Sequence, residues 1–362
     1  MIPYFILILL PVLVWAAGET YRIKCGKQLL LETRSASIDV FMLIFFFLLA
    51  FRGLQCGNDT KQYQHLFSKY TTSPFSQLLT DYNHELGYKL LNRLIGIIGG
   101  NFQLLLMVTS FICVVPLWYF YRRESENQVL TLALFLTVSP FIMYFSGIQQ
   151  AIAMSLGIPA WYAAKSKKLV RFIVLVLLAM QFHTSAFMLF ALYPLYRAKI
   201  TTRWLWFVVP CMAMVYIFRT AIFGFLFKLL WYEYTTTAAT DATTILFLLI
   251  LFGIYSYVLP DNSSISDDAI AMRNILLLSI VLQIFAMLHP LSMRMNYYFL
   301  LFVPVLIPKI ASQSKKQFAQ IARLSIVVMT VYFMYYFVKK VVTDSDSLNI
   351  FPYIPFWQNG SL

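Results

Sequence analysis

The side chains best suited to chemistry in this sequence are ionisable groups at the ends of apolar runs: Arg52, Asp59, Glu85, His183 and Arg294. Ionisable groups in or beside a bilayer are costly, so those that are kept there define a candidate functional site. A carboxylate or an imidazole can serve as a general base, and the planar guanidinium group donates paired hydrogen bonds to a phosphate. We therefore expect a site that combines proton transfer with phosphate binding.

The segment FRGLQCGNDT contains Arg52 and Asp59. Arg52 falls where a membrane span should end, and its guanidinium group suits phosphate binding. Asp59 follows in a turn punctuated by glycines, where the chain can fold back into a cleft, and we expect it to be the preferred general base. Two simpler alternatives stay open: Arg52 reaches the lipid headgroups, and Asp59 caps the helix that DTKQYQHLF predicts.

Glu85 and His183 are the other candidate bases. Glu85 opens the stretch ELGYKLL, where a negative charge also suits the first turn of a helix. His183, in QFHTSAF, interrupts an otherwise apolar stretch, and imidazole can move protons or, when charged, meet a phosphate. Its alternative role is to pack in the turn of a helical hairpin. Ser185 lies two residues on, but no third partner is evident, so a serine-hydrolase triad is weakly supported.

Arg294 lies inside the apolar stretch HPLSMRMNYYF. It therefore needs a watery cavity, a ligand or an acidic partner, and an ion pair with one of the carboxylates above is the alternative to a ligand. Amide side chains that open a short span can bind sugar hydroxyls or hydrogen-bond between helices. The expected substrate-binding residues are the polar side chains near these groups: Gln149, Gln150, Tyr63 and Tyr298.

The composition predicts an all-α, polytopic integral membrane protein. Hydrophobic residues make up 60% of the 362 residues and charged residues only 12%, and the apolar runs do not alternate with polar residues. The net charge of +13 fits Lys and Arg gathered in cytoplasmic loops better than it fits nucleic-acid binding, which we do not expect. No Walker, GxGxxG or HExxH motif is present, and neither a metal nor a nucleotide cofactor is expected.

About 12 apolar segments follow one another along the chain, within one membrane domain spanning residues 1–362. A topology with the N-terminus outside puts most Lys and Arg residues in the cytoplasm, provided that the stretch between Arg171 and Arg197 is a hairpin turning at Gln181–Ser185 rather than one long helix. It also puts the candidate site on the outer face. Two longer outer loops are expected at 53–101 and 220–243.

Each outer loop is expected to contain an amphipathic helix. Residues 86–98 place several leucines on one helical face and polar residues elsewhere, which is typical of a helix lying in the membrane interface. Residues 220–232 show a similar pattern. The C-terminal stretch FPYIPFW, residues 351–357, is expected to be non-helical and to lie in the outer headgroup zone.

The segments RGLQCGNDTKQY, ELGYKLL, GIQQAIAMSL, FHTSAFMLF and MRMNYYFLLFVPVLIP, in this order, resemble the EpsG-like branch of Wzy-type polysaccharide polymerases, which include O-antigen polymerases. The resemblance implies a GT-C-like fold in the bacterial inner membrane. It implies an enzyme that transfers a growing glycan from undecaprenyl diphosphate to a sugar hydroxyl at the periplasmic face, together with a chain-length regulator as partner. The chain departs from the family where Gln149-Gln150 replaces the usual Arg-Gln pair.

In this scheme Arg52 and Arg294 bind the lipid diphosphate, and Asp59 accepts the proton of the acceptor hydroxyl, with Glu85 and His183 as the other candidates. Two other classes of protein stay open. One is an O-antigen ligase-like or acyl-transferring membrane enzyme, because a membrane histidine is common to such proteins. The other is a flippase or transporter of lipid-linked oligosaccharides, although the ionisable groups gather at one face and no internal repeat is evident.

Overall fold

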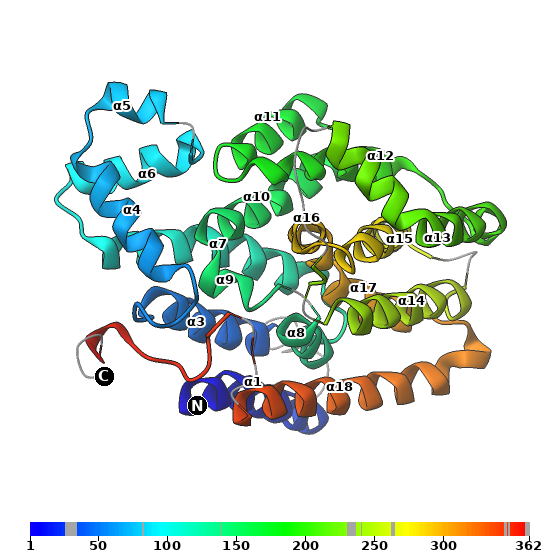
Figure 1. Cartoon of the computed structure of the whole chain (residues 1–362). Helices are drawn as coiled ribbons and strands as arrows, with labels where there is room; N and C mark the ends of the chain where they lie inside the picture. The colour runs from blue at the N-terminus through cyan, green and yellow to red at the C-terminus, as the bar shows by residue number, and fades with distance from the viewer. Residues whose placement is uncertain are drawn as a thin grey trace.

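The computed structural model describes residues 1–25, 35–81, 83–138, 140–229, 237–239, 241–261, 265–343, 346 and 348–358. The chain is helical through most of these ranges, and its two isolated β-bridges join Arg52 to Pro355 and Pro260 to Ser314. Figure 1 shows the helices as one bundle, with a small group of helices (α4 to α6) at one end. The prediction of an all-helical polytopic membrane protein is confirmed.

The α-helices are α1 (Ile2–Cys25), α3 (Ala36–Ala50), α4 (Thr60–Thr72), α5 (Phe75–Thr80), α6 (Leu86–Ile97), α7 (Phe102–Glu124), α8 (Gln128–Thr137), α9 (Met143–Ser146), α10 (Ile148–Lys165), α11 (Leu169–Met180), α12 (Leu192–Arg197), α13 (Leu205–Leu229), α14 (Ala242–Val258), α15 (Asp267–Ala286), α16 (Pro290–Leu300), α17 (Val303–Ser312) and α18 (Ala319–Val342). Short 3₁₀ helices are η2 (Thr184–Ala191), η3 (Thr202–Trp204), η4 (Lys316–Phe318) and η5 (Phe356–Gln358).

Fewer helices are long enough to cross a membrane than the sequence predicts. In the described part of the chain, five helices pass by length and composition, and a sixth span arises if α16 and α17, bent by 45°, are counted together. Four shorter apolar helices, α3, α8, α11 and α14, account for other predicted segments. Turns and breaks shorten several apolar stretches, and the figure of about 12 transmembrane helices stays a prediction.

The stretch between Arg171 and Arg197 is a hairpin, as predicted. Helix α11 ends at Met180, and the chain returns through η2 and α12. The rings of Phe172 and Tyr193 lie 5.2 Å apart, whereas one continuous helix would separate these residues by about 30 Å along its axis. The hairpin places His183 at the tip, between two helical legs.

Charged residues gather at both ends of the bundle. Helix α7 has 23 residues and so spans about 34 Å, close to the thickness of a bilayer core. It ends at Glu124, which meets Lys165 at the end of α10 and Lys309 on α17. The candidate site residues lie at the opposite end, because Gln149 begins the same α10 that ends at Lys165. The bundle therefore holds two charged layers separated by apolar helices.

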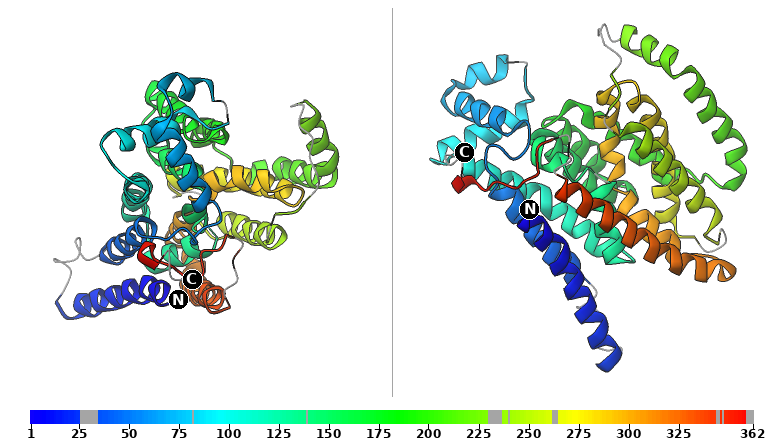
Figure 2. Two further views of the ribbon diagram at one scale, coloured as in Figure 1. Left: turned by 60° about the vertical axis from the view of Figure 1, so that its left-hand side comes forward. Right: turned by 60° about the horizontal axis from the view of Figure 1, so that its bottom comes forward.

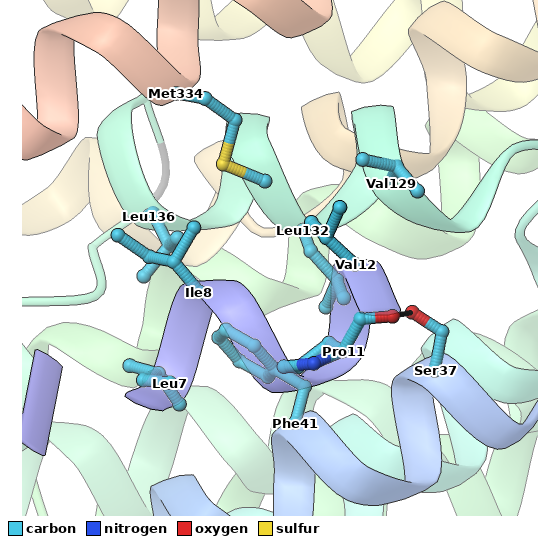
Figure 3. Close-up of a pocket in the computed structure, with 10 residues that line it drawn as sticks. All are labelled: Leu7, Ile8, Pro11, Val12, Ser37, Phe41, Val129, Leu132, Leu136 and Met334. Atoms are coloured by element: carbon cyan, nitrogen blue, oxygen red, sulfur yellow. Dashed lines mark hydrogen bonds between the residues drawn. The ribbon is translucent and has the colours of Figure 1, made fainter. Parts of the chain in front are cut away.

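Helix α1 packs against the bundle through apolar side chains and one hydrogen bond. Figure 3 shows Leu7, Ile8 and Pro11 of α1 facing side chains of α3, α8 and α18. The Ser37 hydroxyl on α3 donates a hydrogen bond of 2.9 Å to the Pro11 carbonyl. A small hydroxyl residue of this kind lets two membrane helices approach closely.

The two chain ends meet beside the candidate site. The Tyr4 hydroxyl on α1 donates to the Ile350 carbonyl at 2.6 Å, and the views in Figure 2 place the N-terminal end of α1 near the end of α18. The C-terminal stretch is extended until its last residues form η5, so the prediction that 351–357 contains no helix is wrong for that final turn.

The two predicted amphipathic helices have different outcomes. Helix α6 forms, with Lys89 and Asn92 buried while Leu94 and Ile97 are exposed, so that its apolar face is free to meet a membrane interface. Residues 220–229 continue α13 instead of forming a separate helix. Residues 230–236 and 240 of the predicted loop 220–243 lie outside the described residues.

Candidate functional site

A cavity of about 460 Å³ opens at the end of the bundle that carries the candidate residues. Asp59 and Arg294 both line it. These residues are far apart in sequence, and the cavity forms because the start of α4 and the helix α16 converge with the ends of α8, α14 and α18 and the C-terminal segment. The structure thus brings a carboxylate and a guanidinium group to one solvent-accessible space.

Arg294 projects from α16 with an exposed side chain. Among the described residues, neither Asp59 nor Glu85 lies within ion-pair distance of it, so the expected alternative of a structural ion pair with either carboxylate is not observed. A guanidinium group beside a cavity and without an acidic partner has donors available for an anionic ligand.

Asp59 occupies the N-cap position of α4, but its side chain makes no capping hydrogen bond. The carboxylate instead accepts a hydrogen bond of 3.2 Å from the Ser146 hydroxyl at the end of α9, and the Asp59 amide donates back to the same hydroxyl at 3.4 Å. The half-buried carboxylate is therefore held at the cavity wall by one hydroxyl, with acceptor capacity remaining for a substrate proton.

Glu85 joins three elements. Its carboxylate accepts hydrogen bonds from the Thr184 amide at 2.8 Å and the Thr184 hydroxyl at 3.1 Å, both at the start of η2, and from the Gln149 amide at 3.3 Å. The alternative placed Glu85 in the first turn of its own helix, and it does occupy the N-cap position of α6, without a capping hydrogen bond. Its contacts fix the hairpin tip to α6 and α10.

His183 is the N-cap of η2. Its Nδ1 accepts a hydrogen bond from the Ser185 amide at 3.3 Å, and the Ser185 hydroxyl lies 2.9 Å from the same nitrogen and 3.0 Å from the Tyr298 hydroxyl. His183 lies in the turn, outside the membrane-spanning helices. Burial lowers the pKa of its imidazole below the usual value, with Glu85 opposing and Arg294 adding to the shift. A neutral imidazole with Nδ1 as acceptor fits these contacts.

The expected substrate-binding residues are not among those that line the cavity. Gln150 is buried and donates a hydrogen bond of 2.6 Å to the Arg294 carbonyl. Tyr63 on α4 packs its ring edge-on against Tyr88 of α6, 5.5 Å away. Burial raises the pKa of the Tyr63 phenol, and the negative charge of Asp59 raises it further. These residues, with Gln149 and Tyr298, support the wall instead of lining it.

Arg52 lies away from the cavity. It is only 2% exposed, its Nη1 donates to the Leu49 carbonyl at 2.5 Å, and its Nε has no partner among the described residues. The C-terminal segment covers it through backbone hydrogen bonds from Gly53 to Ile354 and from Phe356 to Phe51. The predicted role of Arg52 in diphosphate binding stays a prediction, and contact with a ligand would require the segment to move.

Three cavity residues were missed by the sequence reasoning: Asp241 at the start of α14, Lys340 in the last turn of α18, and Asp346. Lys340 could have been found, because it follows an apolar run in the same manner as Arg52. Asp346 is bound to the backbone amides of the C-terminal segment, and no local pattern marks that role. In the described ranges, no three His, Cys, Asp or Glu side chains gather closely enough to hold a metal ion.

The fold and the cavity define a class: a multi-pass helical membrane protein with a cavity lined by carboxylate, guanidinium and ammonium groups at one end of the bundle. The family model of the EpsG family matches residues 38–354, so the chain belongs to the EpsG family, which is associated with exopolysaccharide biosynthesis. No curated protein and no solved structure shows significant similarity to this chain.

Proposed function

We propose that this protein polymerises repeat-unit oligosaccharides carried on undecaprenyl diphosphate, by glycosyl transfer to a sugar hydroxyl of an incoming lipid-linked unit. The observation that carries the proposal is that Asp59 and Arg294 line one cavity of an EpsG-family membrane protein. A lipid-diphosphate donor supplies its own leaving group. The chemistry then needs a base for the acceptor and positive charge for the departing diphosphate.

In the proposed reaction the acceptor hydroxyl oxygen attacks the anomeric carbon of the donor sugar, and Asp59 takes the hydroxyl proton. The bond between that carbon and the diphosphate oxygen breaks, and the lipid diphosphate leaves with the electron pair. Arg294 stabilises the negative charge that develops on the leaving group, and its effect is greatest where water is scarce. Gln150 positions Arg294 through its carbonyl, and Ser146 positions Asp59.

The protein is proposed to lie in the bacterial inner membrane with its site facing the periplasm. The proposed fold is GT-C-like, with about 12 transmembrane helices. A chain-length regulator is the proposed partner. Positive charge supports this orientation: Lys165, Lys309 and their neighbours lie at the end opposite the cavity, where the cytoplasmic surface would be.

Acyl transfer is less well supported by the geometry around Ser185. Its hydroxyl is buried and divided between His183 and Tyr298, while the nearest carboxylate, Glu85, is bound to Thr184 and Gln149. A serine nucleophile would need a carboxylate on the far nitrogen of the histidine and an exposed hydroxyl. A flippase differs in its phenotype, which the following experiment separates from that of a polymerase.

The test is the length of the surface glycan after deletion of the gene. A polymerase mutant should leave a single repeat unit, whereas loss of every repeat indicates a flippase or a ligase. Asp59→Ala and Arg294→Ala should each reproduce the single-unit phenotype at normal protein levels, and the exposed matched controls Glu126→Ala and Arg323→Ala should restore the full ladder. A full ladder in both site variants would remove these residues from the site. Reporter fusions that place residues 183 and 294 in the cytosol would contradict the orientation.

A further inference from the structure

The cavity is lined by apolar side chains, called here the apolar wall, and by five charged side chains, called here the rim. Carbon-rich side chains from the α8–α9 segment, α14, α18 and the C-terminal segment make up much of its surface: Leu136, Val138, Ile142, Met143, Ile245, Phe337, Leu348 and Phe351. The rim carries Asp59, Asp241, Arg294, Lys340 and Asp346. A cavity of this kind suits a ligand with an apolar chain and a compact anionic group.

The rim contains two cations on different helices, Arg294 on α16 and Lys340 on α18. Lys340 Nζ lies 3.4 Å from Asp241 Oδ2, and the two side chains are 28% and 45% exposed. An exposed pair at this distance contributes little stability and exchanges partners readily. Lys340 can therefore move from Asp241 to an incoming anion, while Arg294 forms no ion pair with any residue that the structure describes.

The carboxylate of Asp346, which also belongs to the rim, already has hydrogen-bond partners. Asp346 accepts hydrogen bonds from the backbone amides of Leu348 at 2.7 Å, Ile350 at 3.1 Å and Phe351 at 3.0 Å. These contacts hold the C-terminal segment in place, and the backbone N–H donors stabilise the negative charge of Asp346. The positively charged side chains that line the cavity are Arg294 and Lys340.

We propose that Lys340 and Arg294 form a two-cation clamp for the diphosphate group of an isoprenoid lipid, and that Asp241 is the counter-ion that releases Lys340 when the diphosphate enters. Two cations that line one cavity from separate helices provide one positive charge for each phosphate of a diphosphate, and the apolar side chains of the same cavity accommodate the first isoprene units. The inference rests on the proposed function, which requires a lipid-diphosphate donor, and it adds a second cation and an exchangeable counter-ion.

The test is binding of geranylgeranyl diphosphate to the purified full-length protein in detergent, with geranylgeranyl monophosphate as the comparison ligand. Lys340→Ala should weaken diphosphate binding about tenfold, the loss of one charge-assisted contact, and should reduce the preference for diphosphate over monophosphate. Lys339→Ala, the exposed neighbour that does not line the cavity, should bind as the wild type does. Asp241→Asn should tighten binding severalfold, a gain that misfolding cannot produce.

The outcomes separate the clamp from the proposed function. Unchanged binding by Lys340→Ala, with weakened binding by Arg294→Ala, would overturn the clamp and leave the polymerase proposal standing. Weaker binding by Asp241→Asn would overturn the role of Asp241 as a counter-ion. If diphosphate binding behaves as the clamp predicts but deletion of the gene leaves a full glycan ladder, only the polymerase proposal is overturned. Failure of the wild-type protein to bind the diphosphate would overturn both.

Discussion

Gln150 and Arg294 are joined side chain to main chain: the buried Gln150 amide donates a hydrogen bond of 2.6 Å to the Arg294 carbonyl. The contact ties the first turn of α10 to the middle of α16 and so fixes the helix from which Arg294 reaches the cavity. The residue predicted to bind a sugar thus holds a residue predicted to bind a phosphate.

Replacing Gln150 with Glu should reduce polymerisation strongly, because a carboxylate oxygen would face the Arg294 carbonyl oxygen in a buried place. Gln150→Ala should have a smaller effect, a shorter glycan ladder at normal protein level. The measurement is glycan length on a gel, and Gln64→Glu on the exposed face of α4 is the matched control. A wild-type ladder from Gln150→Glu would show that this contact does not position Arg294.

Glu85 and Asp59 should respond differently to replacement by their amides. Asp59→Asn removes the proposed base and should reduce the rate of polymerisation by at least about 100-fold, within the range for loss of a general base. Glu85→Gln keeps an oxygen that can accept from the Thr184 amide, so its rate should fall by only about threefold. Rates are measured on lipid-linked repeat units with purified protein. The reverse order of severity would make Glu85 the base.

Gly87 allows α6 to contact the hairpin tip. Its amide donates to the Gln181 carbonyl at 2.8 Å, and a Cβ added at Gly87 would lie 2.7 Å from that oxygen. Gly87→Ala should therefore push α6 from the hairpin and cost about 1–3 kcal/mol in stability. Thermal unfolding in detergent measures this loss. Gly18→Ala is the control, because a Cβ there meets nothing within 4 Å; alanine is also favoured over glycine inside a helix such as α1, so the midpoint should not fall.

His183 should make the protein less stable in mild acid. Burial lowers the pKa of its imidazole in the folded protein, so the unfolded chain, with a histidine pKa of about 6.5, binds the proton more readily. Stability is therefore full at neutral pH and falls as the pH drops through about 6.5. His183→Asn keeps a capping acceptor without titrating. The midpoint of thermal unfolding should drop more for the wild type than for His183→Asn between pH 7.5 and 5.5; equal drops would contradict the assignment.

The charged layer at the other end of the bundle should be sensitive to loss of one partner. Lys309 Nζ lies 3.1 Å from Glu124 Oε2, and both side chains are less than one-tenth exposed. Lys309→Met leaves the buried carboxylate with Lys165, 3.6 Å away, and should cost about 3 kcal/mol in unfolding free energy. Arg123→Met, at an exposed side chain 4.0 Å from Glu124, should change it by less than about 0.5 kcal/mol. Adding Glu124→Gln to Lys309→Met should recover part of the loss.

The sequence alone determined that this chain is a helical membrane protein with several membrane spans. Long apolar runs admit few structures in a bilayer, because every backbone polar group must be satisfied internally. The hairpin at His183 was also predictable, because a histidine and a serine in an apolar stretch favour a turn over burial in lipid. The count of full spans was not predictable, since breaks such as the one between α8 and α10 depend on packing.

The tertiary structure decided which polar groups face the cavity and which support it. Asp59 and Arg294 share one cavity, whereas Arg52, chemically as suitable, lies buried beneath the C-terminal segment. Local sequence does not determine which side chains share a cavity, because the distance between two side chains on different helices depends on how the helices cross. Lys340 entered the cavity for the same reason: the last turn of α18 ends beside α14 and α16, a relationship that exists only in the folded bundle.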